Sequence, residues 1–521
     1  MPCSIARRRL LAWIGLLWIA HALCAGGTTA AQTRRFDVVL DPRAEPQPVS
    51  GRLFVFTSTR TTGEPRLGLD WFAPAPFFAA DFEALAVGQR YSVDDTWDSF
   101  PEAVSRLPAG NYRVQAVWHQ AFDSHSPGRG VGNLYSEVAT IRATARGWPR
   151  LELRLTETVH ERPFPQNRWV QEVVLPSPSL SAFHRRPVEH RAAVVLPASY
   201  EEEPYQRYPV IYSIHGFGGD HRRALQYTGG PPQAADGEVE FLRVFLNADC
   251  NWGHHVFADS ATNGPRGTAL VEELIPHIDA EYRTFGQPTA RFLTGHSSGG
   301  WSSLWLQVAY PDVFGGVWST SPDPVDFRDF QRVDLYADPP LSLYFDPSGE
   351  RRPIARRGTT PVLWFPSFGQ MDDVLKRGGQ LRSFEAVFSP LDAKRLPRRL
   401  WDRDTGQIDP QVARAWEAYD IRLILQRNWA QLEPRLQGKL HVVTGGLDTF
   451  YLEGAVELLA ETLRELGSDA QVSVVAGRDH SNILTDELRA QMRREMSDAF
   501  RRHHPLDDAD SLGDTVGSAA Q

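Results

Sequence analysis

The chain has 521 residues, of which 42% are hydrophobic and 23% charged, an ordinary globular composition that is long enough for two or three domains. Its formal net charge is −9 and it has no basic stripe, which argues against a nucleic-acid partner. Two of its three cysteines lie within the first 24 residues, so the fold must rest on a hydrophobic core and not on disulfides.

The first 31 residues have the pattern of a secretory signal peptide. Three arginines at 7–9 precede an apolar run at 10–23, and small residues at 29–31 offer a cleavage site. A retained membrane anchor is the alternative, but the apolar run is short for a full span. We therefore expect residues 1–31 to be removed and the protein to be exported, either to the periplasm or out of the cell, without stable membrane insertion.

Residues 34–155 are predicted to form a β-rich module. The segments 52–57, 112–118 and 151–155 combine β-branched, aromatic and alternating apolar residues, which is typical of strands. Turns rich in proline and glycine separate them, and no long helical pattern interrupts the series. We expect a small all-β, sandwich-like domain that either binds a glycan or covers the domain that follows.

From about residue 166 the pattern changes to strands that alternate with helices. Apolar strands are predicted at 188–196, 208–214, 241–246, 290–294, 439–444 and 471–476. Helical spacing of apolar residues occurs at 267–282, after residue 297 and at 454–466. Such alternation predicts βαβ crossovers, and hence an α/β domain at 166–504 with a mostly parallel sheet covered by helices on both faces.

The stretch 323–437 interrupts this alternation. It is rich in proline, arginine, aspartate and aromatic residues, with helical signals near 410–436. An insertion before the last strands of such a sheet is where lids and substrate clefts are built, so we expect a lid here. Residues 505–521 are acidic and rich in small residues, which predicts a disordered tail.

The strongest motif is Gly295-His296-Ser297-Ser298-Gly299, a G-x-S-x-G nucleophile elbow between a predicted strand and a predicted helix. In that turn the serine stands clear of the sheet, and the glycines let neighbouring elements approach closely. A match to a motif of five residues can arise by chance, but the predicted strand before it and the predicted helix after it support the assignment here. Ser298 is a rival serine, but it would put the glycines out of register. We predict Ser297 as the nucleophile.

A serine hydroxyl needs a base to take its proton as it attacks. In hydrolases with this elbow, an acid and then a histidine follow the serine along the chain. Asp448 and His480 each come just after one of the last two predicted strands, so we expect both at the same sheet edge as Ser297. Asp479 is a competing acid, although its place beside the histidine suits a local cap. Any one of these residues alone would ordinarily be structural; their joint order favours a triad.

A glycine-rich loop offers an oxyanion hole. The segment 215–221, HGFGGDH, follows a predicted strand, and its backbone leaves N–H groups free to hold a tetrahedral intermediate together with the N–H of Ser298. Phe217 is the favoured donor in this loop and Gly216 the second choice. An ordinary glycine turn is the alternative.

Four weaker candidates for lining a substrate cleft are Trp252, His254, Trp301 and Arg478, of which Trp301 could equally belong to the core. His254 and His255, near Asp249 and Asp259, lack the two-plus-two spacing of a zinc site, so no metal is expected. Cys250 has no catalytic motif around it and is best explained as a packed cysteine.

These motifs resemble the esterase D-like family of α/β-hydrolases, which includes feruloyl and acetyl-xylan esterases, enterochelin esterases, S-formylglutathione hydrolases and mycolyltransferases. The resemblance covers about 188–484 and rests on HGFGGDH, GTALVEELIPHIDAEYRT, GHSSGGW, GGLDTFY and GRDHSN. It implies an α/β-hydrolase fold, ester hydrolysis through an acyl-enzyme and no cofactor. It places the triad on Ser297, Asp448 and His480 and the oxyanion donor on Phe217. A β-domain ahead of such a catalytic domain is similar to the enterochelin esterase arrangement.

Together these features predict an exported serine esterase that acts on small-molecule or glycan-linked esters through a Ser-His-Asp triad. The acyl and alcohol parts of the substrate and the oligomeric state stay open. Two alternatives also stay open. An acyltransferase would use the same triad but exclude water and accept a sugar hydroxyl. A non-catalytic protein would use the same fold to bind a glycan or another ligand.

Overall fold

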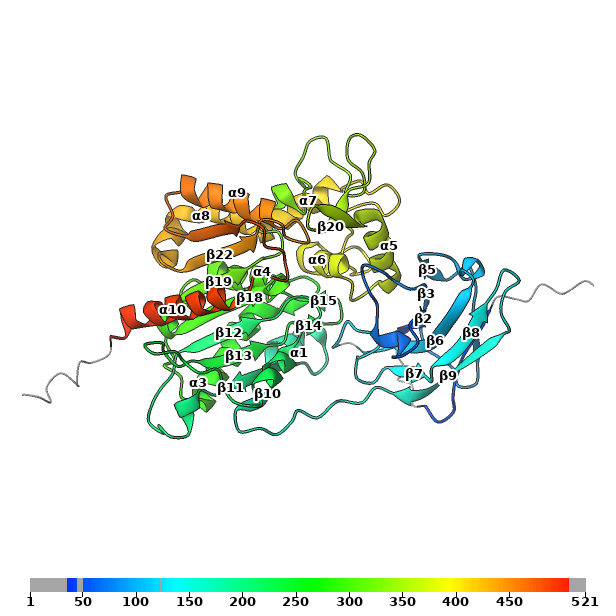
Figure 1. Cartoon of the computed structure of the whole chain (residues 1–521), viewed down its shortest axis with the longest axis horizontal. Coiled ribbons are helices and arrows are strands. Elements are labelled where there is room, and N and C mark those ends of the chain that lie inside the picture. Colours follow the sequence, from blue (N-terminus) through cyan, green and yellow to red (C-terminus); the bar gives the residue numbers. More distant parts are fainter. Residues whose placement is uncertain (1–34, 45–49, 122, 506–521) are drawn as a thin grey trace, which may run out of the picture.

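The computed structural model describes residues 35–44, 50–121 and 123–505 (Figure 1). The predicted signal peptide, and all but the first residue of the predicted tail, lie outside these residues. Within them, every helix is too short or too polar to span a bilayer.

In the described part of the N-terminal region, nine strands join in one continuous sheet of order β4-β1-β9-β7-β6-β2-β3-β5, with β8 paired to β6. They are β1 (Phe36–Leu40), β2 (Gly51–Ser58), β3 (Phe77–Phe82), β4 (Arg90–Val93), β5 (Asp98–Phe100), β6 (Gly110–His119), β7 (Leu134–Ser136), β8 (Ala139–Ala143) and β9 (Leu151–Thr158). The predicted strands at 52–57, 112–118 and 151–155 are confirmed as parts of β2, β6 and β9. The sandwich-like domain itself stays a prediction.

A second sheet carries the predicted alternation of strands and helices. Its order is β10-β11-β13-β12-β18-β19-β22-β23, and every pairing from β13 to β23 is parallel. The strands are β10 (Val170–Pro176), β11 (Glu189–Val195), β12 (Val210–Ile214), β13 (Leu242–Leu246), β18 (Arg291–His296), β19 (Gly316–Thr320), β22 (Leu440–Gly445) and β23 (Gln471–Val475). All six strands predicted for this region are confirmed, whereas β10 and β19 were not predicted.

Helices cover both faces of this sheet, as predicted. They include α1 (Pro178–His184), α2 (Arg266–Ala269), the π-helical turn η5 (Leu270–Leu274), α3 (Ile275–Glu281), α4 (Ser298–Ala309), α9 (Glu453–Glu465) and α10 (Asp486–His503). On one face, Met496 and Phe500 of α10 pack against Ile211 and Phe292. On the other, Tyr212 belongs to the large core that α3 and α4 help to build. Parallel strands buried on both faces are apolar at consecutive positions, which is why the sequence pattern identified them.

Shorter elements connect these layers. Two hairpins, β14 (Asp249–Cys250) with β15 (Gly253–His254) and β16 (Asp259–Ser260) with β17 (Gly264–Pro265), lie between β13 and α2. The 3₁₀ helices are η1 (Pro65–Leu67), η2 (Val104–Arg106), η3 (Ala198–Tyr200), η4 (His221–Tyr227), η6 (Pro288–Ala290), η7 (Phe327–Asp329) and η8 (Glu417–Tyr419).

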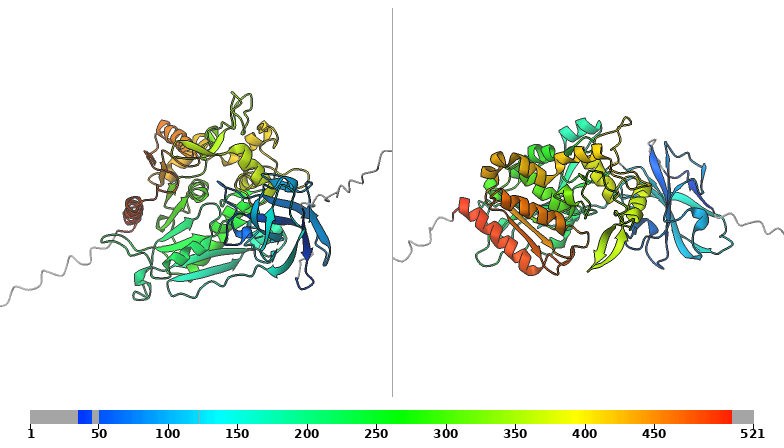
Figure 2. Two further views of the ribbon diagram at one scale, coloured as in Figure 1. Left: turned by 45° about the vertical axis from the view of Figure 1, so that its right-hand side comes forward. Right: turned by 90° about the horizontal axis from the view of Figure 1, so that it is seen from above.

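The 323–437 insertion lies between β19 and β22 and faces the N-terminal sheet (Figures 1 and 2). It contains β20 (Pro353–Arg357), β21 (Thr360–Trp364), α5 (Phe365–Leu375), α6 (Gln380–Phe388), α7 (Pro410–Trp416) and α8 (Ile421–Leu436). The helical signals near 410–436 correspond to α7 and α8. Arg52 of β2, a buried side chain, donates its Nε–H to the carbonyl of Val374 at 3.0 Å and so joins the two parts of the chain.

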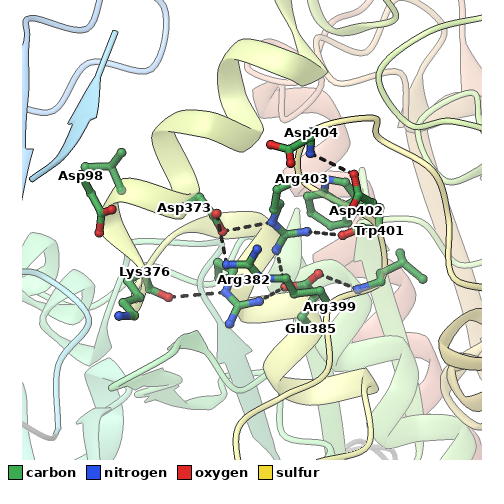
Figure 3. Close-up of polar contacts among 12 residues, drawn as sticks. Asp98, Asp373, Lys376, Arg382, Glu385, Arg399, Trp401, Asp402, Arg403 and Asp404 are labelled. Atoms are coloured by element: carbon green, nitrogen blue, oxygen red, sulfur yellow. Dashed lines mark hydrogen bonds and ion pairs between the residues drawn. The ribbon is translucent and has the colours of Figure 1, made fainter. Parts of the chain in front are cut away.

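A buried ionic network fixes the insertion internally (Figure 3). The Glu385 carboxylate, fully buried on α6, accepts hydrogen bonds from Arg403 Nη2 and from the backbone N–H of Leu400, both at 2.7 Å, and pairs with Arg382. Arg403 also donates its Nε–H to Asp373 of α5 at 3.0 Å. Because an unpaired buried charge is costly, the network holds α6 in one position relative to α5.

Candidate active site

Ser297 lies at the turn between β18 and α4. Its φ of 61° and ψ of −127° are strained for a residue with a side chain. Glycine is required at 299 because a Cβ there would lie 2.1 Å from the carbonyl oxygen of Ile214 on the adjacent strand. The N–H of Ser297 donates to the carbonyl of Thr320 at 3.0 Å, which ties the turn to β19. Packing on both sides therefore maintains the strained geometry of a nucleophile elbow.

Asp448 and His480 form a hydrogen-bonded pair. The Nδ1–H of His480 donates to Asp448 Oδ2 at 2.8 Å. Asp448 is fully buried, and its Oδ1 accepts a hydrogen bond from the N–H of Phe450 at 2.9 Å. Because the ring proton stays on Nδ1, where it donates a hydrogen bond to the carboxylate, Nε2 has a free lone pair that can accept a proton. His480 and Ser297 line the same cavity, so the structure gathers the three predicted residues at one site.

The rival residues have structural roles. Asp479 Oδ1 accepts hydrogen bonds from the N–H groups of Ser481 and Asn482, at 2.8 and 2.9 Å, and so caps a turn. Ser298 is fully buried at the start of α4, where its hydroxyl donates to a carboxylate. Burial raises the pKa of the Cys250 thiol to about 11, so this thiol stays protonated and unreactive.

The loop after β12 runs beside the serine. A Cβ built on Gly216 would lie 3.1 Å from the Cβ of Ser297, and both Gly216 and Phe217 line the cavity. Among the described residues, no acceptor takes a hydrogen bond from the N–H of Phe217 or of Ser298. Two backbone donors are therefore free near the serine, which is what an oxyanion hole requires.

His254 supports this loop from behind. It is buried, donates its Nε2–H to the carbonyl of His215 at 2.8 Å and accepts at Nδ1 from the N–H of Val256 at 3.1 Å. Burial lowers the pKa of His254 to about 4, so the ring is neutral and can accept at one nitrogen while it donates from the other. His254 is not among the residues that line the cavity beside Ser297, and its contacts give it a supporting place behind the loop.

The other three weak candidates also lie away from the cavity. Trp301 is only 1% exposed and stacks on Trp305 at 5.3 Å between ring centroids, so it belongs to the core. The ring of Trp252 lies under the guanidinium of Arg382, whose Cζ is 5.7 Å from the centroid of that ring. Arg478 is exposed. Residue type and position in the sequence do not determine the direction in which a side chain points. No group of three or more histidine, cysteine, aspartate and glutamate side chains within the described residues could hold a metal ion.

Asp323 is a cavity-lining carboxylate that sequence reasoning missed. It follows β19, is 6% exposed and accepts a hydrogen bond from Ser298 Oγ at 2.5 Å. The side-chain amide of Gln380, on α6, donates to Ser298 Oγ at 3.2 Å and to Asp323 Oδ2 at 3.5 Å. Burial raises the pKa of Asp323 to about 6, against the opposing effects of the hydrogen bond from Ser298 and the charge of His480. The carboxyl group therefore changes charge close to neutral pH.

This pKa shift predicts a stability change in Asp323→Asn. A carboxyl whose pKa is raised on folding contributes stability below its ordinary value of 3.8, and that contribution is lost as the pH rises through about 6. The shift corresponds to about 3 kcal/mol, so the variant should gain about that much relative to wild type between pH 4 and pH 7. Urea unfolding of both proteins at the two pH values measures this, and a difference independent of pH would contradict it.

The cavity beside Ser297 has a volume of about 600 Å³ and an aromatic wall. Trp71, which lies between β2 and β3, has its ring centroid 5.7 Å from Phe217 and 5.1 Å from Phe368 of α5. Phe450 completes this wall, with its ring centroid 5.0 Å from that of His480. The wall thus combines the N-terminal region, the loop after β12, the insertion and the loop that carries Asp448, and no local pattern in the sequence could have revealed it.

A parallel sheet with a G-x-S-x-G turn at the carboxyl end of a central strand, and with helices on both faces, defines the α/β-hydrolase class. Within that class, residues 186–483 match the family described as "Putative esterase", and the chain belongs to this esterase family.

Curated relatives and solved structures include further esterases. Esterase MT1326 and Esterase Rv1288, from the CDC 1551 / Oshkosh and H37Rv strains of Mycobacterium tuberculosis, are each 29% identical over 148 residues. That alignment covers 28% of this chain and 32% of each relative, so the chain spans about a third of their length. A ferulic acid esterase is 16% identical over 64% of this chain and 98% of its own, with a TM-score of 0.39. An S-formylglutathione hydrolase from Agrobacterium tumefaciens is 14% identical over 64% and 95%, also with a TM-score of 0.39.

Proposed function

We propose that this chain is an exported serine esterase that hydrolyses carboxylic esters in two steps. In the first, Ser297 Oγ attacks the ester carbonyl while His480 Nε2 takes its proton, and His480 then returns that proton to the departing alcohol. In the second, His480 removes a proton from water, which attacks the acyl carbon. The bond from that carbon to Ser297 Oγ then breaks, His480 returns the proton to Oγ, and the acid is released. Asp448 holds the imidazole in the tautomer that both steps need. The N–H groups of Phe217 and Ser298, with Gly216 beside them, stabilise the oxyanion.

The observation that carries this proposal is the joint placement of the strained Ser297 and the Asp448–His480 pair at one cavity. The strain alone has no structural benefit and costs of order 1–3 kcal/mol. The hydrogen bond at 2.8 Å from Nδ1 leaves Nε2 as the basic nitrogen. A protein that merely binds a ligand has no need of either feature, which favours catalysis over the non-catalytic alternative.

Other parts of the chain receive proposed roles that agree with this function. The signal-like segment 1–31 would direct export to the periplasm or the medium. Residues 34–155 would form a β-domain that contributes Trp71 to the cleft, and 166–504 would form the catalytic domain with 323–437 as its lid. The aromatic wall favours small-molecule or glycan-linked esters that have an apolar or aryl part beside the ester bond.

Labelling with a fluorophosphonate probe tests the proposed nucleophile. We expect a single label on the peptide that contains Ser297, because only an activated serine displaces the fluoride at a useful rate. Labelling should vanish in Ser297→Ala and stay on Ser297 in Ser298→Ala, which removes the rival hydroxyl but keeps the backbone N–H. Absence of label from the wild-type protein, or a label on another residue, would argue against the mechanism.

A further inference from the structure

The cavity at Ser297 continues past the strand ends onto one face of the central sheet. Ile211 of β12, together with Arg243 and Phe245 of β13, lines this extension from the sheet side. Met492 of α10 lines it from the opposite side, as do residues of η4. Between η4 and α10 part of the sheet face is therefore uncovered, and it is joined to the site of the nucleophile.

The strand register gives the depth of this extension. Arg243 pairs with Ile211, and Ile211 pairs with Phe292 on β18. Ser297 comes five residues after Phe292, which corresponds to about 16 Å along the strand direction at about 3.3 Å per residue. Apolar and small polar side chains line the stretch in between, among them Phe245, Met492, Ser213 and Thr294, so an extended chain fits between the serine and the arginine.

The charges along this cavity are unlike those of the whole chain. The chain has a formal net charge of −9, yet the charged side chains that line the cavity, histidines apart and within the described residues, are four arginines and one carboxylate. The carboxylate is Asp323, at the Ser297 end. The arginines are Arg223, Arg243, Arg489 and Arg493. A concave site lined by one sign of charge concentrates ligands of the opposite sign.

Of these four arginines, Arg243 is partly buried and has no salt-bridge partner among the described residues. Among the described residues, only Arg493 of the four arginines has a carboxylate partner, Glu238, at 3.1 Å. Burial lowers the pKa of the Arg243 guanidinium, and the positive charge of Arg493 lowers it further, whereas the charges of Tyr227 and Glu238 raise it. Glu238 forms its salt bridge with Arg493 and not with Arg243. A partly desolvated guanidinium with no carboxylate within salt-bridge distance is stabilised when an anion binds to it.

We propose that Arg243 binds an anionic group, such as a carboxylate, at the far end of the substrate while the ester bond lies at Ser297. The exposed Arg223 and Arg489 attract the same group toward the cavity. The substrate class is then an ester with an extended spacer and a terminal anion. This inference rests on the proposed esterase function, whereas its binding component can be tested without turnover.

Matched pairs of esters test the inference. The probes are p-nitrophenyl monoesters of linear dicarboxylic acids of increasing length, each compared with the same ester in which the free carboxyl is methylated. For the wild-type protein we expect kcat/KM for the acid to exceed that for its methyl ester by about tenfold or more at spacer lengths near 16 Å, and not at short ones. In Arg243→Gln this ratio should fall to about one, and Arg243→Lys should restore part of it.

Arg494→Gln is the matched control. Arg494 adjoins Arg493 on α10 but is exposed and does not line the cavity, so the same loss of charge there should leave the ratio unchanged. A wild-type ratio near one at every length, or equal ratios in wild type and Arg243→Gln, would overturn the inference.

Calorimetric binding of the long dicarboxylic acids to the wild-type protein and to Arg243→Gln separates this inference from the proposed function. We expect affinity at least about tenfold weaker in the variant, even if no ester is turned over. Absence of turnover with this binding difference intact would contradict the esterase proposal alone. Equal binding by the two proteins would contradict the anion site alone.

Discussion

Replacement of Ser297 with alanine is expected to lower kcat for p-nitrophenyl acetate by roughly 10⁵–10⁶-fold, because no acyl-enzyme can form without the hydroxyl. The oxyanion donors on the backbone are unchanged, so a weak residual rate above the uncatalysed reaction should persist. Alanine has the same Cβ as serine, so the strain at φ 61° neither increases nor decreases. Steady-state kinetics together with thermal unfolding measure both expectations.

The control for this variant is Ser303→Ala in the same helix. Ser303 is buried, and its hydroxyl donates to the carbonyl of Gly300 at 2.9 Å. It tests whether a general disturbance of α4 could account for the loss, and we expect kcat to stay within a factor of about three. If both variants lost activity equally, or if Ser297→Ala kept more than about a tenth of the wild-type kcat, the assignment of the nucleophile would fail.

The three residues of the proposed triad could be grouped from the sequence because each signal is local. Ser297 lies in a motif of five residues bounded by an apolar strand and a helical pattern. Asp448 and His480 each follow a strand whose apolar run is distinct in the sequence. The carboxyl ends of parallel strands meet at one edge, so recognising the strands was enough to place the side chains together.

Asp323 was missed because the strand before it was missed. β19 is only five residues long, GVWST, and all five are buried, so it shows neither alternation nor helical spacing. It also stands at the start of the segment in which the regular alternation of elements breaks down. Without that strand, Asp323 seemed to belong to an irregular loop and not to the same sheet edge as Ser297.

Trp71 and Arg243 show a different limit of the sequence. Trp71 reaches the cavity only because the N-terminal sheet packs beside the insertion, a contact between segments hundreds of residues apart. Arg243 lies inside a strand that was predicted correctly. The sequence could not show, however, that η4 and α10 leave the sheet face uncovered at this residue. The side chains that line a cavity depend on which part of a sheet the helices leave uncovered. Hydrophobic patterning in the sequence indicates only which strands and helices are buried.

Asp448→Asn should lower kcat by roughly 10⁴-fold while KM changes little, because the variant reverses the tautomer of His480. The Oδ1 atom of Asp448 accepts from the N–H of Phe450, and an asparagine that keeps this bond must turn its NH₂ toward the imidazole. Nδ1 would then have to accept a hydrogen bond, so the ring proton would move to Nε2, the nitrogen that must take the proton of Ser297. The measurement is kcat and KM with p-nitrophenyl acetate.

Asp479→Asn is the matched control, because it makes the same change one residue before His480. Asp479 caps its turn through one oxygen, and an asparagine oxygen can accept the same two backbone hydrogen bonds. We therefore expect kcat to stay within a factor of about three, since neither the turn nor the tautomer is disturbed. If kcat fell more in Asp479→Asn than in Asp448→Asn, Asp479 and not Asp448 would be the acid that orients His480. If kcat fell only slightly and equally in both variants, an amide at 448 would orient His480 as well as the carboxylate does through its hydrogen bond at 2.8 Å. The proposed role of the Asp448 carboxylate would then be wrong.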